Sequence, residues 1–237
     1  MLQWASATFN ALGPMNERAR AALPDIQALR AYCQRPETVA ALKPEGWAAR
    51  IWEAGRSGRI PLERCPVVMR DYVSPSLDTT IMATGSLVWL LGRHPEQWEL
   101  LRQDPALIPG AISEAIRLES PIRGFTRYVT RDCEIGGTPL AAGSGVLVLY
   151  ASANRDERKW QDAERFDIRR DVREHLGFGF GVHVCVGMHL ARLEMTALLT
   201  ALTQKVRRFE VAEPRWALNN VIHGIEAMQV TIHSTPQ

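Results

Sequence analysis

Cys185 lies in a segment where glycine recurs at short intervals, GFGFGVHVCVG at 177–187. Glycine permits left-handed backbone and a close approach of the main chain to a flat molecule, but it weakens helices and strands. The segment is therefore predicted to be a shaped loop. A helix is expected to begin near Gly187, where free N–H groups and the helix dipole favour an anionic sulfur. The thiolate could then be a nucleophile or a metal ligand, while a merely structural cysteine is the alternative.

The nucleophile hypothesis can be tested on spacing. A phosphatase-type loop requires a histidine directly before the cysteine and an arginine six positions after it, where this chain has Val184 and Ala191. That interpretation fails. Cysteine–histidine hydrolysis could still use a distant histidine such as His175 or His223, but nothing in the sequence orients either one.

The metal-ligand hypothesis leads further. Ordinary zinc binding needs about four ligands, and only His183 and His189 lie near the cysteine. What remains is a metal that needs one protein thiolate because a cofactor supplies its other ligands, as in haem. Gly179 and Gly181 would let the loop lie flat against a porphyrin.

The segment FGFGVHVCVG resembles the haem-binding signature of the cytochrome P-450 family. The resemblance implies that the cofactor is haem b (iron protoporphyrin IX) and that Cys185 is the axial ligand of its iron. It also implies that Phe178 shields the sulfur beside Gly179 and Gly181, and that Gly187 lets the following helix approach the haem. Two further residues match positions that bind the haem propionates, His183 and Arg127.

Two more segments fall in family order. EAIR resembles the ExxR helix and places Glu114 and Arg117 one helical turn apart. AERFDIRRD resembles the following meander motif, with Arg165 at the position that completes a charge cluster with this pair. The resemblance implies a structural clamp behind the cysteine loop rather than a catalytic group. ANRDERKW, which contains Asn154, resembles the approach to that meander.

PSLDTT at 75–80 resembles the acid–alcohol pair of the family's oxygen-binding helix. The resemblance implies that Asp78 and Thr79 are catalytic and deliver protons during the reaction with O2. The alternative is a helix N-cap, a position that Ser and Asp favour. Family members usually carry alanine or glycine followed by glycine where this chain has Pro75 and Ser76, so Pro75 is expected to enforce a kink.

The implied activity is that of a monooxygenase, which inserts one oxygen atom of O2 into an organic substrate. Electrons would come from NAD(P)H through a ferredoxin-type partner. Four apolar residues match substrate-contacting positions and suggest a small or medium hydrophobic substrate, although packing roles fit them equally well: Pro75, Ile122, Phe125 and Ile225.

Composition bounds the remaining possibilities. The chain has 237 residues, a formal charge of +2 and 46% hydrophobic residues, as in a globular protein with no electrostatic case for nucleic acid or an anionic membrane. Its four cysteines form no CxxC pair, which favours a reducing cytoplasm. The longest apolar run, at 81–92, is shorter than the ~20 residues of a membrane span and is predicted to be a buried helix.

The apolar pattern predicts mostly helix over 1–110, followed over 111–237 by the ExxR helix, β-hairpins, meander, cysteine loop, final helix and closing strands. Gly136-Gly137 is expected to form a hairpin turn. The fold class is mainly α with small β-sheets (α+β), a single domain over 1–237. Two helix faces are expected to be buried, namely Leu77, Ile81, Thr84, Val88 and Leu91 in one helix, and Leu190, Leu193, Ala197 and Ala201 with Leu198 and Leu202 in another.

The resemblance covers nearly the whole chain, but only a little over half of the family fold. The amino-terminal helices and most of the larger sheet have no counterpart. We therefore expect the chain alone to bind haem weakly or to aggregate unless a second chain completes it. The two alternatives to an active monooxygenase are a non-catalytic haem-binding module and one half of a two-chain assembly.

Overall fold

The computed structural model describes residues 1–235, which form two compact units, Met1–Thr79 and the part of the chain from Thr80 onward. The boundary falls in the first turn of helix α6 (Asp78–Arg93). The expected single domain over 1–237 stays a prediction, and each unit is described by itself.

The first unit is helical. Its helices are α1 (Leu2–Ala11), α2 (Glu17–Gln34), α3 (Pro36–Ala40), α4 (Trp47–Arg56) and α5 (Cys65–Val73), with a 3₁₀ turn at Leu62–Arg64. Helix α2 begins where Asn16 accepts a hydrogen bond from the Ala19 amide at 3.1 Å, a side-chain N-cap. A small core of Leu29, Cys33 and Met69 joins α2 to α5.

The second unit is built on a larger core. Its helices after α6 are α7 (Pro95–Gln103), α8 (Ile108–Leu118), the short α9 (Tyr150–Ala153) and α10 (Met188–Lys205), with 3₁₀ turns at Pro105–Leu107 and Gly181–His183. Leu91, Leu101, Ile112 and Leu199 are among the residues that fill this core. Helix α10 packs against α8 and α7. The core therefore holds the helix that follows the cysteine loop against the ExxR helix.

The core-facing side of helix α6 matches the expected face at Leu91 but not at Ile81. Ala83, Leu87, Leu90 and Leu91 are buried, whereas Ile81 is 46% exposed. The expectation for Ile81 is wrong because apolar residues lie on more than one side of this helix, so the pattern alone does not choose its inner face.

Helix α10 shows the same effect. Met195, Leu199 and Thr203, spaced four residues apart, face the core. Leu190, Leu193 and the other residues of the predicted face are exposed or half-buried, so that face is wrong although the helix is confirmed. With leucines and alanines on both sides, packing against α8 decides the orientation.

The strands form antiparallel pairs. β1 (Phe125–Tyr128) pairs with β4 (Gly145–Val148), and β2 (Cys133–Ile135) pairs with β3 (Thr138–Leu140). Gly136 and Gly137 join the second pair with φ of 56° and 78°, as a two-residue hairpin requires. β5 (Val206–Val211) pairs with β8 (Val230–Ser234), and β6 (Arg215–Trp216) pairs with β7 (Ile225–Ala227).

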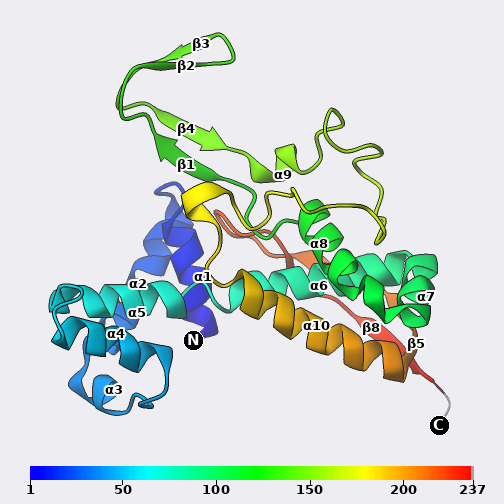
Figure 1. Cartoon of the computed structure of the whole chain (residues 1–237), viewed down its shortest axis with the longest axis horizontal. Helices are drawn as coiled ribbons and strands as arrows, with labels where there is room; N and C mark the ends of the chain where they lie inside the picture. Colours follow the sequence, from blue (N-terminus) through cyan, green and yellow to red (C-terminus); the bar gives the residue numbers. More distant parts are fainter. Residues whose placement is uncertain (236–237) are drawn as a thin grey trace. The chain divides into compact units, whose positions relative to one another are not determined.

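The observed elements confirm a mainly helical fold with small sheets (Figure 1). Among residues 1–235, no helix combines the length and the hydropathy needed to cross a bilayer. The second unit brings the cysteine loop, the ExxR helix and the meander into one body.

Candidate haem-thiolate site

The cysteine loop is closed by its own backbone. The Gly179 amide donates to the Leu176 carbonyl at 2.9 Å, and the Cys185 amide donates to the Phe178 carbonyl at 2.9 Å. The Met188 amide, in the first turn of α10, donates to the Cys185 carbonyl at 3.3 Å. Cys185 is thus held between a tight turn and a helix start, as its sequence context predicts.

Two glycines shape the turn in different ways. Gly179 has φ of +75°, and a Cβ there would lie 2.8 Å from the His183 carbonyl oxygen, so both conformation and space require glycine. Gly181 has φ of +62°, but a Cβ there would meet nothing within 4 Å. The loop is therefore crowded on its inner side and open at Gly181.

The surroundings of Cys185 fit a haem. The Cys185 side chain is exposed, and the apolar side chains of Phe180, Val182 and Val186 beside it are 80%, 97% and 73% exposed. Among residues 1–235, no cluster of three or more His, Cys, Asp or Glu side chains could hold a metal ion by itself. One free thiol beside open apolar surface suits a large flat group that brings its own metal ligands.

The other residues predicted to contact the haem, His183, Gly187 and Arg127, differ in their exposure and contacts. His183 is exposed on the 3₁₀ turn, and Gly187 precedes α10, with space for a Cβ 3.8 Å from the Cys185 sulfur. Arg127 is half-buried on β1 and donates to the Tyr150 hydroxyl at 3.0 Å. Their contacts with haem stay predictions.

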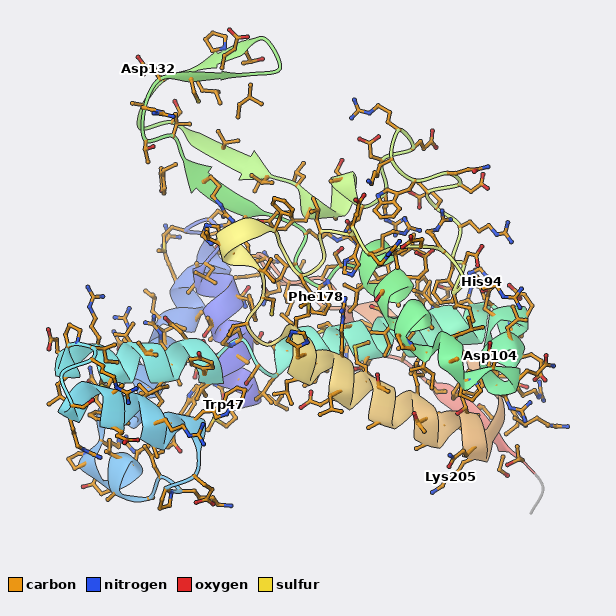
Figure 2. All side chains as sticks on the ribbon, in the orientation of Figure 1. Trp47, His94, Asp104, Asp132, Phe178 and Lys205 are labelled. Carbon is orange, nitrogen blue, oxygen red and sulfur yellow. The ribbon has the colours of Figure 1, made fainter. Side chains whose placement is uncertain are left out.

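Phe178 packs inward. Its ring lies against the main core, 5.8 Å from the His175 ring centroid and 5.2 Å from the Arg192 guanidinium carbon. Figure 2 labels Phe178 in the segment that leads into α10. Its expected role in shielding the sulfur stays a prediction.

Glu114 and Arg117 form a clamp in the core behind this loop. Both side chains are fully buried on α8, and Arg117 Nε and Nη2 donate to the two Glu114 carboxylate oxygens at 2.7 and 2.9 Å. Arg117 Nη1 also donates to the carbonyls of Asn154 and Ala163 at 2.7 and 2.8 Å. An ion pair this deep is tolerated only because nearly every polar atom has a partner.

The third member of the cluster differs from the expected one. Arg170 Nε donates to Glu114 Oε1 at 3.1 Å, whereas the Arg165 side chain is exposed. Arg165 contributes only its carbonyl, which accepts from Arg117 at 3.4 Å. The prediction that the Arg165 guanidinium completes the cluster is therefore wrong. The sequence offered the adjacent arginines at 169–170 as other candidate partners for Glu114. Only the path of the meander, however, brings Arg170 to the carboxylate.

The two candidate histidines have structural partners. His223 Nε2 lies 2.8 Å from Glu119 Oε2, and its ring stacks on Trp216 at 4.6 Å. His175 is buried, and its Nδ1 accepts a hydrogen bond from the Gly177 amide at 3.0 Å. Burial, aided by the positive charges of Arg192 and Arg117, lowers the pKa of His175 to about 4. His175 is thus neutral near pH 7, with Nδ1 as an acceptor.

The predicted acid–alcohol pair begins α6 and belongs to the first unit. Asp78 is 6% exposed, and burial raises its pKa. The Thr79 hydroxyl donates to the Pro75 carbonyl at 3.0 Å. Thr79 thus reaches back four residues at the start of the helix, a local bond to the backbone that threonine side chains commonly make.

The predicted pocket residues differ in exposure. Pro75 is exposed in the first unit, while Ile122 and Phe125 are half-buried in the second. Ile225 is 8% exposed and lies beside Gly85 of α6. A Cβ added at Gly85 would be 3.6 Å from the Ile225 Cβ. Ile122 pairs with Ile222 through an isolated antiparallel β-bridge. This pairing within the second unit accounts for part of the burial of Ile122.

Comparisons with known proteins point to one family. A family model for cytochrome P450 matches residues 91–224. Cytochrome p450 CYP199A2 of Rhodopseudomonas palustris is 40% identical over 98% of this chain and 57% of its own length. Linalool 8-monooxygenase of Pseudomonas putida is 36% identical over 70% of this chain and 43% of its own length. The structure of cytochrome P450 CREJ in complex with (4-ethylphenyl) dihydrogen phosphate matches with a TM-score of 0.90 at 28% identity, covering 98% of this chain and 60% of that one.

The fold and the family match define the class of protein to which the chain belongs. The matched residues, 91–224, make up more than half of the chain and include the clamp, the meander and the cysteine loop, so the chain belongs to the cytochrome P450 family. The expected partial fold is confirmed, and the chain spans 57% of the length of CYP199A2. Members of this family use haem as their cofactor.

Proposed function

We propose that the chain supplies the thiolate side of a haem monooxygenase, with Cys185 as the axial ligand of the iron. The observation that carries the proposal is the exposed Cys185 thiol, held by backbone hydrogen bonds on a glycine turn above a fully buried Glu114–Arg117 clamp. When bound, haem supplies the redox chemistry that places one atom of O2 in the substrate and reduces the other to water. The thiolate donates electron density that favours O–O cleavage.

The protein residues have separate roles in this proposal. Gly179 and Gly181 keep the loop flat, Gly187 allows α10 to begin beside the sulfur, and Phe178 covers the sulfur. His183 and Arg127 bind the propionates. Glu114 and Arg117, with Arg170, hold the loop from behind without touching the reacting atoms.

Asp78 and Thr79 are proposed to manage protons. Burial raises the pKa of the Asp78 carboxyl and so favours its protonated form, which suits a group that passes on a proton. The Thr79 hydroxyl, which donates to the Pro75 carbonyl, can turn that proton toward another acceptor when substrate and O2 are bound. Replacing either residue is expected to lower product yield per electron consumed more than substrate affinity.

The substrate is proposed to be a small or medium hydrophobic molecule. Pro75, Ile122, Phe125 and Ile225 are all apolar, and relatives include a linalool 8-monooxygenase and a steroid C26-monooxygenase of Mycobacterium tuberculosis. Electrons are proposed to come from NAD(P)H through a ferredoxin-type partner. A cytoplasmic location agrees with four free cysteines in the described residues.

A second candidate is a haem-binding part that works only when completed by further polypeptide. The observation that favours it is the chain's coverage of 57% of CYP199A2, together with the exposed apolar side chains of Leu147 in β4 and Leu149 just after it. The completing segment could belong to a second chain, which would co-purify with this one.

The test is the absorption spectrum of the haem-reconstituted chain, reduced and exposed to carbon monoxide. We expect the red-shifted Soret band of thiolate ligation in the wild type. Cys133, which is also exposed, provides the matched control. Cys133→Ala should keep the band and Cys185→Ala should lose it. A band that survives in Cys185→Ala would refute the ligand assignment, while haem binding only after addition of a completing polypeptide would favour the second candidate.

A further inference from the structure

Asn154 is a fully buried polar residue that the proposed chemistry does not use. It lies at the carboxyl end of α9, 1% exposed. Its Nδ2 donates to the Ser120 hydroxyl at 2.9 Å, and its Oδ1 accepts from the Leu176 amide at 2.7 Å. Its backbone carbonyl accepts from Arg117 Nη1 at 2.7 Å. One residue thus joins the ExxR helix, the start of the meander and the entry to the cysteine loop.

The hydrogen bonds continue from Asn154 to the sulfur ligand. Leu176, held through its amide by Asn154, accepts the Gly179 amide through its carbonyl at 2.9 Å. Within the same turn, the Phe178 carbonyl accepts the Cys185 amide at 2.9 Å. Both ends of Leu176 are therefore fixed, and the turn that carries Cys185 is built directly on it.

We propose that Asn154 is a positioning residue that sets the place of the cysteine loop relative to the Glu114–Arg117 clamp. It acts through the Leu176 amide and does not touch the cofactor. The proposal rests on the proposed function only in taking Cys185 as the haem ligand, because the hydrogen bonds belong to the protein itself.

An amide suits this position for a chemical reason. The site needs one donor toward Ser120 and one acceptor toward Leu176, which a carboxamide supplies without charge. Ser120 is 1% exposed and donates its own proton to the Ile116 carbonyl at 2.9 Å, so it has an acceptor to offer Asn154. A ligand loop attached in this way is fixed by directed bonds in addition to apolar packing.

The first experiment measures hydrogen exchange of the Leu176 amide in the haem-free full chain, by NMR with ¹⁵N-leucine labelling. Asn154→Ala removes the acceptor and should speed exchange roughly fivefold to tenfold, the effect of one lost buried hydrogen bond. Ser120→Ala is the matched control because it removes the partner of Nδ2 and leaves the Leu176 bond. The Leu199 amide in the core reports global opening.

The outcomes separate the roles. Faster Leu176 exchange in Asn154→Ala, with Leu199 unchanged and Ser120→Ala close to wild type, supports the proposal. Unchanged Leu176 exchange in Asn154→Ala, or an equal effect of Ser120→Ala, overturns it. If Asn154→Ala does not fold, Asn154→Asp decides, since it keeps an acceptor toward Leu176. Protection of Leu176 retained in Asn154→Asp supports the proposal, and its loss overturns it.

A second measurement connects the loop to the cofactor. Haem transfer from the reconstituted chain to apomyoglobin should be several-fold faster for Asn154→Ala than for Ser120→Ala. If the wild-type chain retains no haem, the proposed function fails. The exchange rate of the Leu176 amide still tests the positioning role of Asn154, because it is measured on the haem-free chain. If wild-type chain retains haem and transfer is equal in the two variants, Asn154 does not position the ligand loop.

Discussion

Replacing Glu114 by alanine tests whether the buried clamp holds the second unit together. Arg117 is fully buried, and the Glu114 carboxylate is its counter-ion. The same carboxylate accepts from Arg170 at 3.1 Å and from the Asp167 amide at 3.1 Å. Glu114→Ala therefore leaves one buried guanidinium without its counter-ion and an amide without its acceptor.

The expected cost is about 3–5 kcal/mol, the range for breaking a buried ion pair by removing one partner. Such a loss is a large fraction of the ~5–15 kcal/mol that stabilises an ordinary domain. Glu114→Gln should cost less, because the amide keeps the shape and one acceptor but not the charge.

The chain contains a matched control for this substitution. Glu99 and Arg102 have the same i,i+3 spacing and the same 2.7 Å distance, but their side chains are 49% and 22% exposed. Because solvent screens this pair, Glu99→Ala should change stability very little. Comparing the two variants therefore separates the effect of burial on stability from the effect of the geometry of the ion pair.

The assay is urea unfolding followed by pulsed hydrogen exchange and mass spectrometry. Peptides from residues 80–235 report the second unit separately from peptides of the first unit. We expect Glu114→Ala to shift only the second-unit transition to much lower urea. A Glu114→Ala shift no larger than that of Glu99→Ala would refute the reasoning.

Two further predictions concern the cysteine loop. Because burial lowers the pKa of His175 to about 4 from an ordinary value near 6.5, the unfolded chain binds more protons between these values. The free energy of unfolding should therefore fall by up to about 1.4 kcal/mol per pH unit as pH drops from 6.5 toward 4. Urea titrations at pH 7 and pH 5 should show a smaller difference in His175→Asn, which keeps an acceptor for the Gly177 amide; equal differences would argue against it. Gly181→Ala should cost about 1–2 kcal/mol for its left-handed φ alone, and Gly179→Ala should cost more because its Cβ meets the His183 carbonyl at 2.8 Å. Equal unfolding free energies for these two variants would contradict that ranking.

The sequence by itself determined the glycine-rich turn that carries Cys185. Gly179 and Gly181 have positive φ angles, which glycine adopts more easily than other residues. Because this requirement is local, the residue types alone indicate it. The pairing of Glu114 with Arg117 could also be predicted from the sequence, because side chains three residues apart on a helix lie next to each other. The hairpin at Gly136-Gly137 and the closing strands followed from turn chemistry and alternation in the same local way.

The tertiary structure alone decided which long-range partners reach that loop. Arg170 rather than Arg165 pairs with Glu114, because the path of the meander, not its composition, brings one guanidinium inward. Asn154 reaches Leu176 across 22 residues of sequence, a contact that no local pattern encodes.

The inner faces of α6 and α10 were also decided by packing. Both helices carry apolar residues on more than one side, so periodicity permits several inward faces. Burial of Leu87 and Leu199, with Ile81 and Leu193 left exposed, follows from which neighbouring elements each helix meets. The sequence thus determined local chemistry, and the tertiary structure determined which side chains support it, because burial depends on residues far apart in the chain.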